Sequence, residues 1–204
     1  MKRLLRLRHW QIFMAIVGLP VILPVIISIL SGFIVLPYSE TAFNAIIIVG
    51  LLLGILFCLE MYVLWFYAIG TVLYPYLPSA IQSNLKLKRF KIFMRIAIVY
   101  QFILVVYLVF HTFDTYYSYY DWCLTMVLFC LHLLTMLCIL YCMYVAAKTL
   151  KAAELKRPVT FGDFAGDFFL LWFFPIGVWI LQPRINKIVA RQPESDMDIF
   201  KEYH

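Results

Sequence analysis

The 17 lysine and arginine residues of this 204-residue chain fall into four clusters that alternate with long apolar runs. The clusters occupy residues 2–8, 86–95, 148–157 and 184–201. The connections 37–42 and 114–121 contain no basic residue. Loops on the cytoplasmic side of multi-spanning membrane proteins are enriched in lysine and arginine. The pattern therefore predicts a chain that crosses a bilayer several times, with its N-terminus and its basic segments in the cytoplasm.

Composition excludes an ordinary soluble domain. The chain is 65% hydrophobic and 14% charged, whereas a typical soluble domain is nearer half apolar and about a quarter charged. A globule of this length could not hide so much apolar surface from water, so lipid must cover part of it. The net charge of +6 is carried by residues that border apolar runs. We therefore expect anionic lipid headgroups, and not nucleic acid, to be the counter-charge.

The predicted fold is an all-α integral membrane protein with four transmembrane helices in a single domain, residues 1–190, and a short polar cytoplasmic tail, residues 191–204. The first apolar run is longer than the 7–15 residues, roughly, of a signal-peptide core, so we expect it to remain as an anchor. Each run reaches the roughly 20 residues that a crossing needs. The predicted spans are residues 12–36, 43–74, 92–113 and 122–147.

A fifth apolar segment, residues 164–181, has two interpretations. As a continuous helix it would reach about 27 Å, just enough to cross. Pro175 and Gly177 interrupt its middle, and a proline there removes a helix hydrogen bond. A fifth crossing would also place the last four basic residues outside. We favour a re-entrant hairpin that leaves the C-terminus in the cytoplasm, and a fifth span is the alternative.

Glu60 is the single charged residue of the second apolar run. A carboxylate within hydrocarbon is costly, so it marks a functional site or a pairing. One interpretation is a proton or cation carrier. The other is a structural hydrogen bond, or a position near the inner membrane surface. His132 and Gln101, on the fourth and third runs, are the candidate partners of Glu60 at similar depth.

Gly50 and Gly54 form a G-x-x-x-G motif on the same run. Small residues four apart allow close approach of helix backbones, so the motif predicts a packing face. Glu60 lies roughly 100° around the helix from these glycines. The motif leaves open whether the packing is within the chain or between chains.

A set of polar residues flanks the fifth apolar segment. Thr160 and Asp163 fit a capping box, and Asp167 lies four residues further along the same helix face. In the hairpin arrangement five residues converge on one cytoplasmic rim: Asp163, Asp167, Gln182, Arg184 and Asn186. The paired acids could bind a metal or a headgroup-bearing substrate. Alternatively, they cap the helix and form salt bridges with Lys156, Arg157 or Arg184.

The cysteines indicate neither a metal site nor a disulfide framework. All five lie inside apolar runs and none belongs to a C-x-x-C pair, so small packing residues are the better interpretation. The signatures of serine hydrolases, zinc proteases and phosphate-binding loops are also absent. No cofactor is predicted.

Three functional hypotheses follow. The first is a non-enzymatic accessory or assembly subunit that packs with another membrane protein or with a second copy of itself. The second is a small transporter or channel subunit that uses Glu60 as a proton or cation carrier. The third is a lipid-acting enzyme that uses Asp163 and Asp167. Because the connections between runs are short, we expect a bacterial inner membrane as the location.

Overall fold

The computed structural model describes residues 1–35, 39–82, 85–113 and 119–190, and within these ranges every regular element is a helix. The predicted polar tail, residues 191–204, lies outside the described residues. The first short helices are α1 (Lys2–Leu5), α2 (His9–Phe13) and the π-helical turn η1 (Met14–Gly18). The remaining elements are α3 (Leu19–Ile34), α4 (Glu40–Val72), η2 (Tyr74–Tyr76), α5 (Ser79–Gln82), α6 (Leu87–Phe113), α7 (Tyr119–Leu155), α8 (Phe161–Trp172) and α9 (Phe174–Ala190).

Among the described residues, four helical segments are long and apolar enough to cross a membrane, as the sequence predicts. Their bounds are His9–Ile34, Glu40–Tyr76, Leu87–His111 and Trp122–Leu155. The fourth segment continues eight residues past the predicted end at residue 147, because α7 stays helical beyond Lys148 and Lys151 to Leu155. The α-helical class and the four apolar helices are therefore confirmed, with revised ends.

The described residues form two compact units. The helices α4, α6 and α7 are each divided between the two units. We call residues 13–64 and 88–142 the bundle unit. We call residues 1–12, 65–87 and the described part of 143–204 the hairpin unit.

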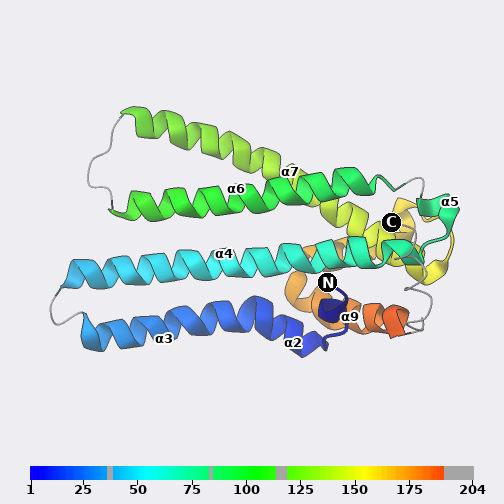
Figure 1. The fold of residues 1–204 in the computed structure, drawn as a ribbon, viewed down its shortest axis with the longest axis horizontal. Helices are drawn as coiled ribbons and strands as arrows, with labels where there is room; N and C mark the ends of the chain where they lie inside the picture. Colours follow the sequence, from blue (N-terminus) through cyan, green and yellow to red (C-terminus); the bar gives the residue numbers. More distant parts are fainter. Residues whose placement is uncertain (36–38, 83–84, 114–118, 191–204) are drawn as a thin grey trace, which may run out of the picture. The chain divides into compact units, whose positions relative to one another are not determined.

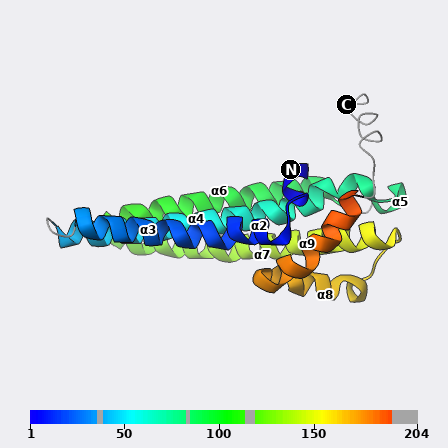
Figure 2. The same ribbon diagram turned by 90° about the horizontal axis from the view of Figure 1, so that it is seen from below.

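In the bundle unit, α3 and the first part of α4 lie side by side (Figures 1 and 2). Pro24, inside α3, has no N–H to give to the carbonyl of Pro20 four residues earlier. Gly54 of α4 comes against this carbonyl, since a Cβ placed on Gly54 would lie 2.8 Å from the Pro20 oxygen. The proline and the glycine together let the two backbones approach closely.

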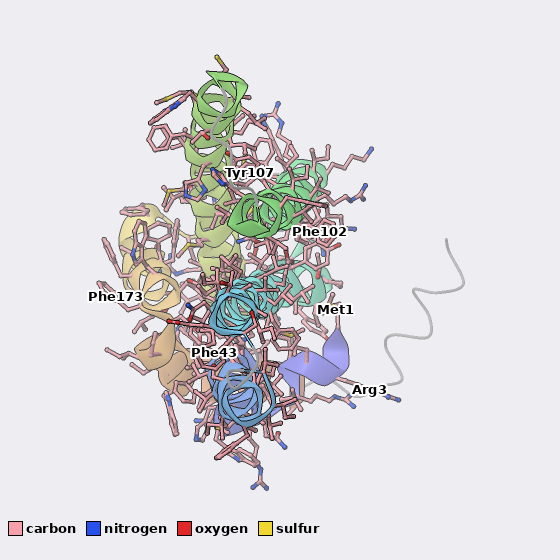
Figure 3. The ribbon with its side chains drawn as sticks, turned by 90° about the vertical axis from the view of Figure 1, so that its left-hand side faces the viewer. Met1, Arg3, Phe43, Phe102, Tyr107 and Phe173 are labelled. Atoms are coloured by element: carbon pink, nitrogen blue, oxygen red, sulfur yellow. The ribbon has the colours of Figure 1, made fainter. Side chains whose placement is uncertain are left out.

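Hydrogen bonds from tyrosines connect α6 and α7 in the same unit. The Tyr100 hydroxyl donates to the Leu128 carbonyl at 2.8 Å. The hydroxyls of Tyr107 and Thr125 are 2.8 Å apart and share a hydrogen bond; Tyr107 is labelled in Figure 3. These bonds fix the register between two helices that otherwise present apolar surfaces.

The hairpin unit contains the helix pair α8 and α9, which double back on each other (Figure 2). The sequence predicts a break at Pro175 and Gly177, but the structure places it at Phe173 (φ −85°, ψ 62°). Pro175 instead lies in the first turn of α9, where its missing N–H has no helical acceptor to lose. Gly177 lies where the two helices touch, since a Cβ there would be 1.7 Å from the Leu170 carbonyl oxygen.

We expect Gly177→Ala to lower the free energy of unfolding by about 1–3 kcal/mol, because α9 would have to move away from the Leu170 backbone. Gly166→Ala is the matched control, since a Cβ at Gly166 of α8 meets nothing within 4 Å. Removing a helical glycine there should stabilise by about 0.5–1 kcal/mol. Thermal unfolding in detergent measures both. Equal effects of the two substitutions would contradict the close contact.

Candidate functional site

The densest group of charges in the described chain lies where α7, α8 and α9 meet in the hairpin unit. The Arg184 guanidinium donates to both carboxylate oxygens of Glu154, from Nε and from Nη2, each at 2.6 Å. It also donates to Asp167, from Nη1 to Oδ1 at 2.5 Å and from Nη2 to Oδ2 at 3.1 Å. One arginine thus binds two carboxylates from two other helices. We call Lys151, Glu154, Asp167 and Arg184 the charge cluster.

Lys151 completes the charge cluster. Its ammonium lies 3.7 Å from Glu154 Oε2 and 3.9 Å from Asp167 Oδ2. The cluster therefore holds two cations and two carboxylates and carries no net charge. The Asp167 side chain is only 6% exposed, so its charge depends on these partners. The hydrogen bonds to Glu154 raise the pKa of Arg184 most, and Asp167 raises it further.

A second polar group joins the N-terminal segment to α9. The fully buried Gln182 accepts a hydrogen bond from Trp65 Nε1 at 2.9 Å. Its amide nitrogen donates to the Leu5 carbonyl at 2.9 Å and contacts the Leu7 carbonyl at 3.1 Å. Asn186 donates to the same Leu7 carbonyl at 3.1 Å. The Leu5 and Leu7 carbonyls lie at and beyond the end of α1, where helical N–H donors are lacking, so these side chains supply the hydrogen bonds.

Asp163 caps the N-terminus of α8. Its Oδ2 accepts from the Thr160 backbone N–H at 2.8 Å and from the Thr160 hydroxyl at 2.9 Å. Its Oδ1 accepts from Arg157 at 2.9 Å. The Thr160 backbone bond, followed by the Arg157 bond, lowers the pKa of Asp163 from its ordinary 3.8 to about 2.

The structure brings together part of the predicted rim. Asp167 and Arg184 are paired, and Gln182 donates to Asn186 at 3.1 Å. Asp163 is instead engaged by Thr160 and Arg157. These contacts match the capping and salt-bridge alternative for the two acids. Sequence reasoning missed Glu154, Lys151 and Trp65; the one available signal was that Glu154 is a lone acid among the four basic residues of 148–157.

Glu60 is half-buried on α4 in the bundle unit and makes no hydrogen bond or ion pair with the described residues. In particular, it forms no hydrogen bond with His132 or Gln101, its predicted partners in the described chain. The His132 ring lies against the Tyr100 ring, with centroids 5.8 Å apart. Gln101 is buried, and its Oε1 has no hydrogen-bond donor within the described chain.

The two glycines of the G-x-x-x-G motif have different surroundings. Gly54 packs within the chain, against Pro20. At Gly50 a Cβ would meet nothing within 4 Å, and Gly50 lines an apolar groove of about 400 Å³ between α3 and α4. The other residues lining it are Ile27, Ala42, Ala45, Ile46, Val49 and Leu53. We call it the Gly50 groove.

No protein family matches this chain, and no characterised relative and no similar solved structure was found for it. Its functional interpretation therefore depends on the geometry described above.

We expect Arg184→Gln to lower the free energy of unfolding by about 2–4 kcal/mol, because Glu154 and the nearly buried Asp167 would be left side by side. Arg157→Gln is the matched control, since that arginine is 56% exposed and has one carboxylate partner; its loss should cost about 1 kcal/mol or less. Unfolding in detergent compares the two. Asp167→Asn should restore part of the stability lost in Arg184→Gln, and no restoration would contradict the coupling.

The cap at Asp163 should give stability a dependence on acid pH. A carboxyl with a lowered pKa stabilises the fold at pH values above its unfolded pKa of about 3.9, and this contribution disappears as pH falls toward the folded pKa of about 2. Unfolding of the wild-type chain and of Asp163→Asn, measured from pH 5 to pH 2, should therefore converge at the acid end. Parallel curves over that range would contradict the assignment.

Proposed function

We propose that this chain is a four-span membrane protein that acts as a non-enzymatic subunit, and that α4 binds a transmembrane helix of a different membrane protein. In this proposal the N-terminus and the charge cluster lie on the cytoplasmic side, in a bacterial inner membrane. The α8–α9 hairpin enters the bilayer from that side and returns. The observation that carries the proposal is the Glu60 carboxylate on an apolar face of α4, which has no partner among the described residues.

The distribution of side chains along the α8–α9 hairpin supports the re-entrant arrangement. The residues around the turn are large, apolar and exposed: Phe169, Trp172, Phe173, Ile176, Trp179 and Ile180. Phe173, labelled in Figure 3, is 59% exposed. The charged residues Asp167 and Arg184 lie away from the turn and pair with each other. An α8 of 12 residues reaches only about 18 Å, which suits a helix that dips into a bilayer and does not cross it.

The face of α4 that carries Glu60 supports the assembly proposal. Ala42, Val49 and Leu53, which line the Gly50 groove, precede Glu60 by 18, 11 and 7 residues. At 3.6 residues per turn they lie within about 20° of Glu60 around the helix. The small residues Ala42, Ala45 and Gly50 in the groove leave room for a neighbouring helix backbone. The same face thus combines a place for a helix with a carboxylate that has no partner in the described part of the chain.

The chemistry of Glu60 indicates which kind of helix would bind there. Lipid tails offer no hydrogen-bond donor, so a carboxylate within hydrocarbon requires a donor from protein or water. A second copy arranged symmetrically along α4 would place two Glu60 carboxylates against each other, which like charges disfavour. A different chain that carries a lysine, arginine or amide side chain at this depth satisfies Glu60 better.

Glu60, without a partner within the described ranges, is also the observation that favours a transporter, the second candidate function. A carrier would expose Glu60 to water, and Glu60→Gln would stop proton or cation flux into sealed vesicles. The lipid-enzyme hypothesis has a weaker basis, because Asp163 and Asp167 are each engaged by a different arginine.

A photoreactive amino acid at Leu53 should crosslink to another protein in native membranes. Leu53 is 52% exposed on the Glu60 face, and Phe102, 61% exposed on α6 and labelled in Figure 3, is the matched control position. We expect the Leu53 probe to give one adduct of discrete mass and the Phe102 probe to give lipid adducts. Combining the Leu53 probe with Glu60→Leu should reduce the protein adduct about tenfold, as expected for the loss of one charge-assisted hydrogen bond.

Each outcome of this experiment has a defined meaning. Lipid adducts alone at Leu53 would overturn the assembly proposal. An adduct of twice the mass of this chain would show that the occupant of the groove is a second copy. A protein adduct that is unchanged by Glu60→Leu would separate the groove from the carboxylate and leave Glu60 to the transporter hypothesis.

A further inference from the structure

A cavity of about 370 Å³ opens beside the charge cluster in the hairpin unit. It is lined by Tyr76, Ala153, Glu154, Lys156, Arg184, Lys187 and Ile188. Three of these side chains are cationic and one is a carboxylate, so the wall carries a net charge of about +2. Neither the proposed contact at α4 nor the salt bridges of the charge cluster account for this cavity.

The two lysines supply the positive charge that the cavity can offer to a ligand. Glu154 and Arg184 are already paired through two hydrogen bonds. Lys187 is exposed and makes no hydrogen bond or ion pair with the described residues. The Lys156 ammonium gives one hydrogen bond, to the Tyr76 carbonyl at 2.8 Å, and an ammonium has three hydrogens to donate. Both lysines therefore keep unused donors at the cavity.

Lys156 holds a backbone conformation that a glycine would adopt more easily. It follows the last residue of α7 with φ 55°, in the left-handed region where a side chain costs energy and glycine is the usual residue. Lysine at this position brings an ammonium to the cavity at the expense of backbone stability.

The cavity lies where two candidate membrane spans end. Tyr76 is the last residue of the span Glu40–Tyr76, and Glu154 precedes the last residue of the span Trp122–Leu155. A site at the ends of apolar spans lies at the depth of lipid headgroups. Phospholipid phosphate is the anion most concentrated at that depth, and lysine is a common phosphate ligand.

We propose that this cavity binds the phosphate of a phospholipid headgroup, with the ammonium groups of Lys156 and Lys187 as its ligands. The guanidinium of Arg184 forms the back of the site and stays paired with Glu154 and Asp167. The inference rests on the membrane insertion proposed above, but not on the contact at α4. The acyl chains would extend from the cavity along the apolar surface of the spans.

Native mass spectrometry of the purified full chain in detergent tests this site. The probes are a phosphatidylglycerol and a diacylglycerol with the same acyl chains but no phosphate. Glycerol 3-phosphate is the soluble source of the same phosphate chemistry. The variants are Lys187→Gln, Lys156→Gly and their combination. Lys88→Gln, an exposed lysine of α6 outside the cavity lining, is the matched control for charge.

We expect the wild-type chain and Lys88→Gln to retain phosphatidylglycerol equally, and the double variant to retain about tenfold less. Diacylglycerol should bind all of them weakly and alike. Lys156→Gly relieves the left-handed strain, so it should fold at least as stably as the wild type, which thermal unfolding verifies. A loss of retention in this variant would then reflect the missing ammonium and not unfolding.

Two results would overturn the proposal. Retention of phosphatidylglycerol by the double variant at the level of Lys88→Gln would remove the lysines from the site. Lysine-dependent binding of glycerol 3-phosphate without retention of phosphatidylglycerol would assign the cavity to a soluble phosphate compound. Membrane insertion is tested separately by alkaline extraction of membranes, so its failure would be distinguishable from failure of the phosphate site.

Discussion

The hairpin unit depends on one arginine. Arg184, on α9, holds the end of α7 to the middle of α8, because its planar guanidinium has enough donors to bind Glu154 and Asp167 at once. Lysine could not replace it, since an ammonium cannot bind two carboxylates side by side in this bidentate way. The close packing of Gly177 on Leu170 sets how α8 and α9 cross, and the arginine sets which of their residues lie level with each other.

How much of this could be foreseen from sequence differs between elements. The four long helices were predictable from apolar run length, since a backbone surrounded by apolar groups must satisfy its own hydrogen bonds. The pairing of Asp167 with Arg184 was within reach once a hairpin was assumed. Glu154 and Trp65 were not, because their partners Arg184 and Gln182 are 30 and 117 residues away and no periodicity reports such contacts. The sequence predicted the helix break at Pro175 and Gly177 and not at Phe173. A proline is as compatible with the first turn of a helix as with a break, so its position alone does not locate the break.

In the bundle unit, individual backbone and side-chain contacts between helices have a specific structural cause. Pro24 frees the Pro20 carbonyl, and Gly54 supplies the space beside it. Tyr100 reaches across to the Leu128 carbonyl of α7. Without a hydrophobic driving force between helices in lipid, such contacts and close backbone approach determine which helices pair. The Glu60 carboxylate and the buried Gln101 Oε1 differ, since neither has a hydrogen-bond partner among the described residues. The proposed helix contact depends on Glu60.

The contact of Gln182 with the Leu5 carbonyl joins residues that are 177 positions apart. During synthesis at about 5–20 residues per second, the N-terminal segment would wait roughly 10–35 s before its partner leaves the ribosome. The Leu5 carbonyl therefore lacks this partner until α9 has been made. The arrival of α9 then joins residues 5 and 182, so the hairpin unit is assembled only after most of the described chain has been made.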